Sequence, residues 1–260
     1  MTGRALVTGA GARLGQAMAI YLGHRGFDVA VHYAASDAGA QETVAQIEAA
    51  GARAVAMQAD LLDLDDTDAL LPRAAAALGG PITCLINNAS IFEYDTVATA
   101  SRDSWDRHFG SNLRGPFHLT QAMAAQDLAP LEDSCGEPMA AGLIVNMVDQ
   151  RLLKLTPEFM TYTLAKAGLW TLTQTAARAL APAIRVNAIG PGPTLQGARQ
   201  SQAHFLAQRA ATVLERGANP SDIIAALGFF LDSPSVTGQL ICIDGGQHLA
   251  WKTPDILGPE

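Results

Sequence analysis

Short apolar runs alternate along the chain with longer segments in which apolar residues recur at helical spacing. The apolar runs predict strands at residues 4–8, 28–33, 53–58, 83–87, 142–148, 184–189 and 239–243. The segments between them predict helices at residues 13–25, 36–50, 65–78, 101–127, 157–180 and 221–231. Strands separated by helices form βαβ crossovers. We therefore expect an α/β fold with a seven-stranded, mainly parallel, doubly wound sheet and helices on both faces.

Turn and cap signals mark some of the element boundaries. Ser36 is expected to cap the second helix and Gly51 to end it. Residues 131–141 are acidic and contain Gly and Pro, which predicts a surface loop. No linker or internal repeat divides the chain, so residues 1–260 are interpreted as one domain.

A second irregular segment, G-P-G-P-T-L-Q-G at 190–197, follows a predicted strand end. Open α/β sheets bind ligands at such strand ends. The helical pattern at 203–215 comes next, so we expect a substrate loop or lid over about 190–217.

Composition narrows the function classes. Of the 260 residues, 49% are hydrophobic and 16% charged, which indicates a large core and excludes a disordered chain. The net charge of −8 and the absence of a basic run argue against nucleic-acid binding. No signal peptide and no membrane span is evident, so a cytoplasmic protein is expected.

Cysteine and histidine spacing gives no metal site. Cys84, Cys135 and Cys242 lie far apart and form no C-x-x-C pair, so we expect neither a disulfide framework nor a thiolate zinc site. The histidines show no metal-binding spacing and are mostly interpreted as surface or half-buried residues: His24, His32, His108, His118, His204 and His248.

The first strand runs into a glycine-rich turn, T-G-A-G-A-R-L-G, at residues 8–15. Glycines at a strand-to-helix turn let the backbone approach a pyrophosphate, and the helix N-terminus adds N–H groups and partial positive charge. The turn departs from the G-x-G-x-x-G spacing: after Gly9 and Gly11, Leu14 takes the third glycine position and Gly15 follows. Nucleotide binding remains the favoured interpretation, and a glycine turn without a ligand is the alternative.

The end of the second predicted strand bears on cofactor choice. NAD sites usually carry an acid there, whereas this chain has H-Y-A-A-S at 32–36, with Asp37 slightly late. Arg13 lies in the glycine loop and would face a 2′-phosphate or a substrate, unless it is a solvated first-turn residue. NADP(H) is therefore favoured over NAD.

Tyr162 and Lys166 lie four residues apart on a predicted helix and project from one face. A free phenol has a pKa of about 10, and a nearby ammonium is expected to lower it, so that Tyr162 acts as a general acid. The pair alone is weak evidence, but other polar groups accompany it at predicted strand ends or on a neighbouring helix: Asn87 to Ser90, Asn112, Asp149 and Pro191 to Pro193.

Taken together, these motifs resemble the short-chain dehydrogenases/reductases over essentially the full length. The matching pieces are T-G-A-G-A-R-L-G, A-D-L near Asp60, N-N-A-S, Asn112, Y-T-L-A-K, I-R-V-N with P-G-P, and D-G-G at 244–246. The resemblance implies a Rossmann-type subunit that usually forms tetramers.

The same resemblance implies roles for single residues. Tyr162 would be the acid, Lys166 would bind the nicotinamide ribose and tune Tyr162, and Asn112 would hold a water in a proton relay. Asp60 would lie near the adenine and Asn88 near the cofactor ribose. The other residues expected to contact the cofactor are Gly9, Gly11, Leu14, Gly15, Ala89, Pro191 and Gly192.

Two positions depart from the family pattern and are similar to its pteridine reductase branch. Arg13 replaces a usual glycine, and Asp149 replaces a usual serine. V-H-Y with Ser36, N-N-A-S-I-F and M-V-D extend the likeness, whereas Ala35 replaces an arginine common in that branch beside the 2′-phosphate.

The branch implies a substrate site. Phe92 would stack on a pterin ring opposite the nicotinamide, and Ser90 and Arg13 would lie near the pterin and the cofactor phosphates. Ser36 and His32 would support the 2′-phosphate.

The chemistry of a carboxyl group makes Asp149 intelligible. An ionised carboxylate cannot donate a hydrogen bond to a developing oxyanion, so Asp149 suits carbonyl reduction poorly. Reduction of a C=N bond instead needs a proton on nitrogen, which a carboxyl paired with Tyr162 can hold or pass. Asp149 can also accept hydrogen bonds from the amino and N–H groups of a pterin.

The sequence therefore favours an NADPH-dependent reductase that takes a dihydropterin to the tetrahydro form. One alternative is a carbonyl reductase for a sugar, steroid, quinone or acyl substrate. Another is a non-catalytic nucleotide sensor, against which the intact Tyr162–Lys166 pair argues.

Overall fold

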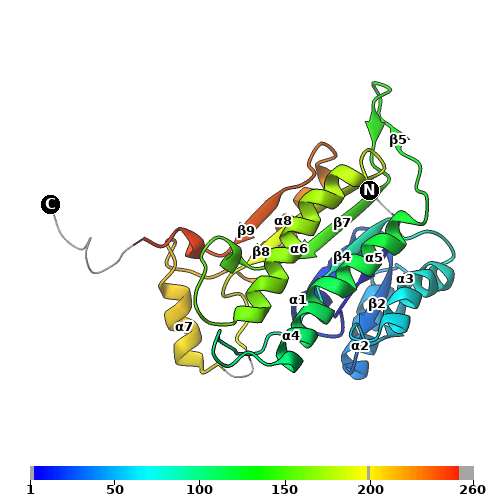
Figure 1. Ribbon diagram of the computed structural model, residues 1–260. Helices are drawn as coiled ribbons and strands as arrows, with labels where there is room; N and C mark the ends of the chain where they lie inside the picture. The colour runs from blue at the N-terminus through cyan, green and yellow to red at the C-terminus, as the bar shows by residue number, and fades with distance from the viewer. Residues whose placement is uncertain (1–2, 198–199, 252–260) are drawn as a thin grey trace.

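Seven parallel strands form one sheet in the order β3-β2-β1-β4-β7-β8-β9 (Figure 1). The computed structural model describes residues 3–197 and 200–251. The strands of this sheet are β1 (Gly3–Val7), β2 (Phe27–Tyr33), β3 (Ala54–Gln58), β4 (Cys84–Asn87), β7 (Gly142–Met147), β8 (Ile184–Pro191) and β9 (Leu240–Ile243). The α-helices are α1 (Arg13–His24), α2 (Asp37–Ala49), α3 (Leu64–Leu78), α4 (Arg102–Phe109), α5 (Gly115–Ala124), α6 (Met160–Ala179), α7 (Gln202–Ala210) and α8 (Pro220–Asp232). The doubly wound parallel fold expected from the alternating pattern is confirmed.

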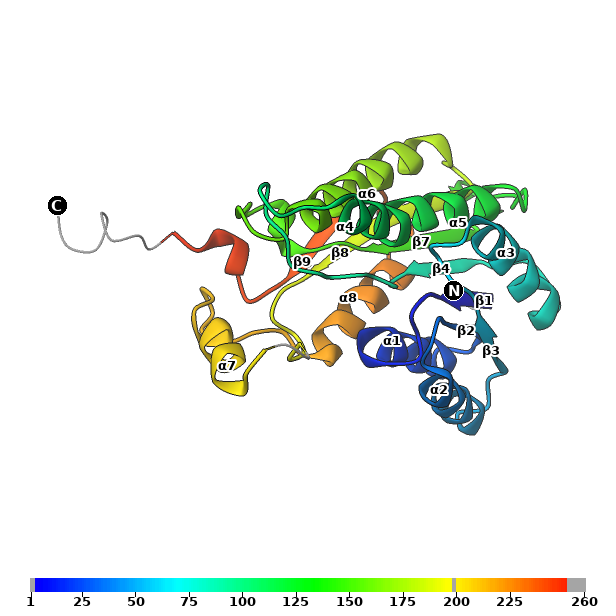
Figure 2. The same cartoon turned by 60° about the horizontal axis from the view of Figure 1, so that its bottom comes forward.

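Helices cover both faces of the sheet (Figure 2). On one face α1, α2 and α8 pack over a core that contains Phe27, Ile47 and Phe230. On the other face α3, α5 and α6 enclose a core that contains Leu70 and Leu119, with α4 packed against α6. Because both faces are covered, the central strands are mostly apolar and deeply buried, as in β7, where every residue is buried.

The strand order reverses between β1 and β4, and this reversal positions the functional site. β1 pairs with β2 on one side and with β4 on the other, so the connections after these strands leave in opposite directions. Such a switch point opens a crevice at the carboxyl ends of the strands, where open α/β sheets bind ligands.

The predicted long helix at 101–127 contains a π-helical turn, Gly110–Arg114, between α4 and α5. Asn112 lies in this turn. A π-helical turn inserts an extra residue into the helix and re-aims the side chains beside it, and such turns are common at functional sites. The apolar periodicity does not reveal it, because the helix continues on both sides.

Three boundary predictions can be compared with the structure. Gly51 has a φ of +87°, which suits the residue expected to end α2. Ser36 stands at the predicted N-cap position, but its side chain makes no capping hydrogen bond. The expected surface loop at 131–141 contains a short antiparallel hairpin, β5 (Leu131–Glu132) with β6 (Pro138–Met139), which projects from the molecule in Figure 1.

The predicted lid segment contains α7, which is shorter than the helical pattern at 203–215. Ser201 caps this helix through a hydrogen bond from the His204 backbone N–H, 3.2 Å long. None of the residues in α7 is buried, so this helix does not contribute to the core. Among the residues that the structure describes, no helix is long and apolar enough to span a membrane.

Gly39 of α2 tests the packing that fixes the loop after β1. A Cβ placed there would lie 2.0 Å from the carbonyl oxygen of Gly11, a backbone atom that cannot rotate away. Gly39→Ala is therefore expected to lower the free energy of unfolding by about 1–3 kcal/mol, as overpacking does. Urea denaturation measures the change, with Glu48→Ala on the exposed face of the same helix as control. Equal stability of both variants would contradict the packing described here.

Candidate active site

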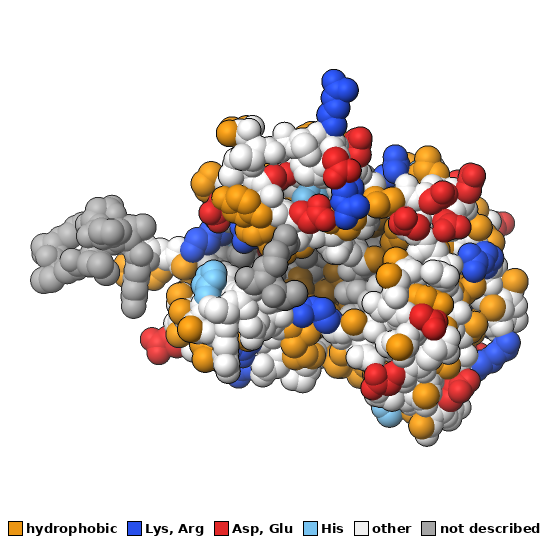
Figure 3. Space-filling view, turned by 90° about the horizontal axis from the view of Figure 1, so that it is seen from below, with side chains coloured by type: hydrophobic (Ala, Val, Ile, Leu, Met, Phe, Trp, Pro, Cys, Tyr) orange, Lys and Arg blue, Asp and Glu red, His pale blue; other side chains and the backbone are white. Residues whose placement is uncertain are grey.

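A cavity of about 700 Å³ follows the carboxyl ends of β1, β2, β4, β7 and β8. Figure 3 shows this face of the molecule hollowed near its middle. Every site residue predicted from the sequence lines the cavity except Asn112. These lining residues are Gly9, Gly11, Arg13, Leu14, Gly15, His32, Ser36, Asp60, Asn88, Ala89, Ser90, Phe92, Asp149, Tyr162, Lys166, Pro191 and Gly192.

The glycine loop leaves no room for side chains at the points where it turns. Gly9 has a φ of +64°, and a Cβ on Gly15 would lie 2.2 Å from the carbonyl oxygen of Gly9. A Cβ on Gly11 would lie 2.8 Å from the carbonyl oxygen of Ser36. The loop delivers the chain to α1, whose N-cap residue, Ala12, makes no side-chain capping bond. The first N–H groups of α1 thus have no side-chain cap beside the cavity, and this suits a phosphate.

Asn88 and Ala89 attach the end of β4 to the glycine loop. The backbone N–H groups of both residues donate to Thr8 Oγ1, each over 2.9 Å. The Asn88 side chain donates to the carbonyl oxygens of Thr8 (2.8 Å) and Gly9 (3.3 Å). These bonds cross two neighbouring strands and hold the cavity floor rigid.

His32 is buried at the end of β2, with 1% of its surface exposed. Its Nδ1 accepts a hydrogen bond from the Gly9 N–H (3.0 Å), so its Nε2–H donates to the carbonyl oxygen of Ala59 (3.1 Å). Burial lowers its pKa to about 4, so the ring is neutral at physiological pH. Both nitrogens are engaged, so the ring positions the glycine loop and offers no donor to a 2′-phosphate.

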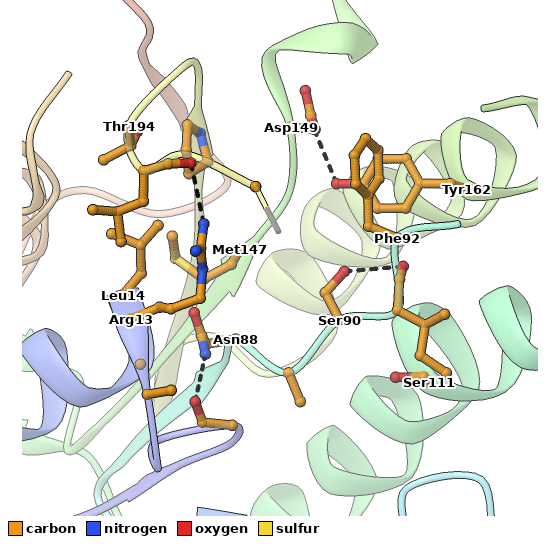
Figure 4. A pocket seen from close by; sticks show the side chains of 18 of the residues that line it. Arg13, Leu14, Asn88, Ser90, Phe92, Ser111, Met147, Asp149, Tyr162 and Thr194 are labelled. Carbon is orange, nitrogen blue, oxygen red and sulfur yellow. Dashed lines mark hydrogen bonds between the residues drawn. The ribbon is translucent and has the colours of Figure 1, made fainter. Parts of the chain in front are cut away.

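Arg13 adopts a left-handed conformation, with a φ of +55°. This region favours glycine, which explains why the related motif usually has glycine at this position. The guanidinium donates to the carbonyl oxygens of Gln196 (2.9 Å) and Leu195 (3.1 Å). Arg13 therefore links the glycine loop to the segment after β8. In Figure 4 its side chain lies across the cavity from Tyr162.

The end of the cavity beside β2 contains no carboxylate from the β2–α2 connection. Ala34, Ala35 and Ser36 line it there, whereas Asp37 does not. A hydrogen bond with the Asp37 carboxylate raises the pKa of Tyr33, so this acid is engaged with a neighbouring side chain.

Tyr162 and Lys166 project from one face of α6 into the other end of the cavity. The Tyr162 hydroxyl donates to Asp149 Oδ2 over 2.9 Å. Lys166 Nζ donates to the carbonyl oxygen of Met147 over 2.7 Å. The second oxygen of Asp149 accepts from the Arg151 N–H over 2.9 Å, which fixes the carboxyl group just after β7.

Burial dominates the protonation of these three groups. It raises the pKa of Asp149, raises that of Tyr162 well above 10 and lowers that of Lys166 to about 8. The expectation that Lys166 lowers the Tyr162 pKa is thus wrong for this structure, because burial and the nearby Asp149 charge prevail. Tyr162 keeps its proton at neutral pH and is a donor.

Asn112 holds neighbouring backbone through its side chain, and its water-holding role stays a prediction. Its side chain is fully buried, donates to the carbonyl oxygen of Ile91 and accepts from the Ile91 N–H, each over 2.8 Å. Both ends of the amide are therefore engaged with one residue. The side chain holds the segment after β4 in place and does not reach the cavity.

Phe92 is 43% exposed and belongs to an aromatic group at the cavity wall. Its ring stacks on Phe159 with centroids 4.3 Å apart and meets the edge of Tyr162 at 4.7 Å. The Arg151 guanidinium lies 4.8 Å from the Phe159 ring centroid. The sequence offered no signal for Phe159 or Arg151 at this wall, because their contacts depend on how the segments after β4 and β7 meet.

Comparison with known proteins establishes the family. The family model for short chain dehydrogenase matches residues 4–206. The 3-oxoacyl-[acyl-carrier-protein] reductase FabG of Staphylococcus aureus is 31% identical, over 96% of this chain and 99% of its own. L-rhamnose 1-dehydrogenase (NAD(P)(+)) of a Sphingomonas species is 32% identical, over 94% and 95%. The chain belongs to the short-chain dehydrogenase family.

A solved structure is more similar than either of these relatives. FolM alternative dihydrofolate reductase 1 from Brucella canis, complexed with NADP, is 41% identical. It superposes with a TM-score of 0.89 over 97% of this chain and 96% of its own.

The buried His32 makes the stability of the protein depend on pH. Its pKa falls from 6.5 in the unfolded chain to about 4 in the folded one, so the unfolded state binds more protons below neutrality. We expect the free energy of unfolding to drop by up to about 3 kcal/mol through this group as the pH falls from about 6.5 to 4. Urea unfolding across this range measures it.

The matched variants are His32→Gln and, at an exposed position of α1, His24→Gln. The first should flatten the acid limb of the stability curve, and the second should leave it unchanged. An unchanged acid limb in His32→Gln would mean that other groups carry the pH dependence.

Proposed function

We propose that this protein is an NADPH-dependent reductase that takes a dihydropterin to the tetrahydro form. The observation that carries the proposal is the 2.9 Å hydrogen bond from Tyr162 to Asp149 beside the half-exposed Phe92 ring. A carboxyl–phenol pair next to an aromatic face suits a flat heterocycle whose ring nitrogen must gain a proton.

The cavity fits NADPH. The first turn of α1 has no side-chain cap, and glycines whose Cβ atoms would collide with backbone surround it. The β2–α2 connection brings no carboxylate to repel a 2′-phosphate, and Ser36 lines the cavity there. The FolM structure and that of a short chain dehydrogenase from Burkholderia cenocepacia contain NADP. We assign Lys166 to the nicotinamide ribose and Asp60 to the adenine end.

Bound NADPH supplies the hydride to the carbon of the C=N bond. Tyr162, protonated at neutral pH, donates its proton to the ring nitrogen as the pair of electrons moves onto it. Asp149, whose pKa burial raises, returns a proton to the phenolate through the bond that joins them. The charge on Lys166 stabilises the transient phenolate, and solvent restores the proton on Asp149.

The remaining site residues hold the substrate. Phe92 presents its ring to one face of the pterin. Ser90 lines the same wall, and Arg13 faces it across the cavity. The name of the FolM relative, an alternative dihydrofolate reductase, accords with a reduced pterin ring as substrate class.

A carbonyl reductase is the second candidate, because sequence relatives include the 3-oxoacyl reductase and the rhamnose dehydrogenase. Asp149 argues against it, because it replaces the serine hydroxyl that the family usually offers to a developing oxyanion, and its side chain is paired with Tyr162. A nucleotide sensor without activity has less support, because the Tyr162–Lys166 arrangement is intact.

We also propose that copies of this chain pair through the outer surface of α4, α5 and α6, as in a homotetramer. Trp105, Phe117 and Leu164 are exposed there, at 45%, 44% and 43%. Phe109 and Leu113 line an apolar groove of about 460 Å³ on the same surface. A patch of this kind usually marks an interface.

A reducing cofactor and free cysteines fit the cytoplasm.

The substrate assignment is tested by NADPH oxidation at about 340 nm with dihydropterins, dihydrofolate and simple ketones, with NADH in parallel. We expect turnover of dihydropterins with NADPH preferred. Turnover of ketones alone would retain the family chemistry and overturn the pterin assignment.

Tyr162→Phe removes the proton donor and keeps the ring against Phe92. We expect kcat to fall by about 10²–10⁴-fold, the usual contribution of a general acid. NADPH affinity, followed by the fluorescence of the bound cofactor, should stay within about twofold, since the loss of one hydroxyl removes no phosphate contact. Full activity in this variant would exclude Tyr162 as the acid.

Asp149→Ser exchanges the carboxyl for the neutral hydroxyl usual in the family. We expect pterin reduction to fall by about 10²-fold or more and ketone reduction to rise, because a hydroxyl donates to an oxyanion. Asp149→Asn is the control that removes the titratable acid and keeps the shape. If Asp149→Ser reduced pterins as well as the parent does, the carboxyl would have no part in the reaction.

Light scattering after size exclusion tests the interface. The parent chain should elute as a tetramer, and Phe117→Glu should dissociate it to smaller species because a charge is buried poorly at an apolar contact. Glu48→Ala on α2 is the control that should leave assembly unchanged. A monomeric parent would contradict the proposed interface.

A further inference from the structure

The segment after β4 is held by hydrogen bonds at Ile91, Glu93 and Asp95, on either side of Phe92 and beyond it. Ile91 is held by Asn112, and the Glu93 N–H donates to His108 Nε2 over 3.1 Å. Asp95, two residues on, is buried and contacts the start of α6. Ser90, Ile91 and Phe92 line the cavity, so the ties at Ile91 and Glu93 flank the Phe92 ring.

His108, Thr161 and Asp95 form one continuous hydrogen-bonded chain inside the protein. The Thr161 hydroxyl donates to Asp95 Oδ2 in a short bond. Its oxygen therefore accepts from the His108 Nδ1–H, 2.7 Å away. This leaves His108 Nε2 as the acceptor for the Glu93 N–H. Only the neutral Nδ1–H tautomer satisfies all three bonds.

Protonation states support this directionality. Burial lowers the pKa of His108, which keeps the imidazole neutral. Burial would raise the pKa of Asp95, but the hydrogen bonds from Thr161 outweigh it and lower that pKa, so the carboxylate is charged. A charged acceptor at one end orients the hydroxyl, and the hydroxyl orients the imidazole.

Asp95 also completes the start of α6. Its Oδ1 accepts from the Thr161 N–H over 3.1 Å, and its backbone carbonyl accepts from the Phe159 N–H over 2.8 Å. Phe159 stands at the N-cap in a left-handed conformation, with a φ of +56°, and makes no side-chain capping bond. The Asp95 side chain, from a distant segment, takes the role of the missing cap.

We propose that His108, Thr161 and Asp95 are positioning residues that fix the Phe92 ring relative to the Tyr162 hydroxyl. The inference rests on the proposed function in that Phe92 carries the reducible ring and Tyr162 supplies the proton. The Thr161 hydroxyl connects the two rings. Thr161 precedes Tyr162 in the sequence, and its hydroxyl is linked through His108 to the backbone N–H of Glu93, the residue after Phe92.

The distance between the Phe92 and Tyr162 rings explains why the His108–Thr161–Asp95 hydrogen bonds affect catalysis and not only stability. The centroids of the Phe92 and Tyr162 rings are 4.7 Å apart. The reacting nitrogen must lie within reach of both the plane of the Phe92 ring and the Tyr162 hydroxyl. A shift of about 1 Å at a reacting centre can reduce the rate about 10²-fold. Among the described residues, no hydrogen bond joins His108, Thr161 or Asp95 to β1, β2 or α1, which build the cofactor end of the cavity.

Thr161→Val tests the proposal, with Thr161→Ser as the matched rescue. Valine keeps the shape and removes the hydroxyl, so we expect kcat to fall about tenfold or more and the KM of the reducible substrate to rise. NADPH affinity should remain within about twofold, because the phosphate end is untouched. Serine retains the hydroxyl and should restore kcat to within about threefold.

Asp95→Asn is the second variant and keeps the helix start occupied. An amide nitrogen in place of Oδ2 cannot accept from Thr161, so the hydroxyl reverses and His108 must switch to the Nε2–H tautomer. In that tautomer the His108 Nε2–H points at the Glu93 N–H, so two donors face each other and the hydrogen bond is lost. ¹⁵N NMR of the histidine ring nitrogens should show the Nδ1–H form in the parent and its loss in the variant, with a fall in kcat.

The outcomes separate this inference from the substrate assignment. All variants are assayed on whichever substrate the parent turns over, pterin or ketone, since Tyr162 is the donor in both cases. Unchanged kcat and KM in Thr161→Val would overturn the positioning role. So would an equal loss in Thr161→Ser, a parallel loss of NADPH affinity, or an Nε2–H tautomer of His108 in the parent.

Discussion

All seven strands of the main sheet run in the same direction, and the site follows from this constraint. Parallel strands place their carboxyl ends at one edge, so the chain must deliver Gly9, Asn88, Asp149 and Gly192 to the same cavity. The crossover helices that parallel pairing requires bring two further parts to that edge. These parts are the uncapped start of α1 and the face of α6 that carries Tyr162.

The second theme is the protonation that burial imposes. Burial at the cavity wall pushes Tyr162, Asp149 and Lys166 each towards its neutral form. A phenol that keeps its proton beside a carboxyl group is a donor to an incoming nitrogen. The same burial that stabilises the fold thus defines the direction in which the site can move a proton.

Two of the four non-glycine residues with positive φ in the described part of the chain lie beside the cavity and are held by long-range bonds. Arg13 and Phe159 both adopt left-handed conformations that cost non-glycine residues free energy. The carbonyl oxygens of Leu195 and Gln196 hold Arg13, and Asp95 holds the start of α6 beside Phe159. Arg13 begins α1 and Phe159 precedes α6, which carries Tyr162. The strained residues therefore lie where the backbone orients side chains of the site.

Local pattern was sufficient for much of this protein. Apolar periodicity determined the strands and most helices, the glycine spacing determined the turn after β1, and the four-residue interval placed Tyr162 and Lys166 on one face. The roles of His32, His108 and Asn112, the raised Tyr162 pKa and the Phe92–Phe159 stack were decided only by the tertiary structure. Each depends on a partner distant in the sequence, as Gly9 is from His32 and Thr161 from His108. A side chain's charge and hydrogen-bond partners follow from the neighbours that burial brings to it, and single-chain periodicity carries no information about them.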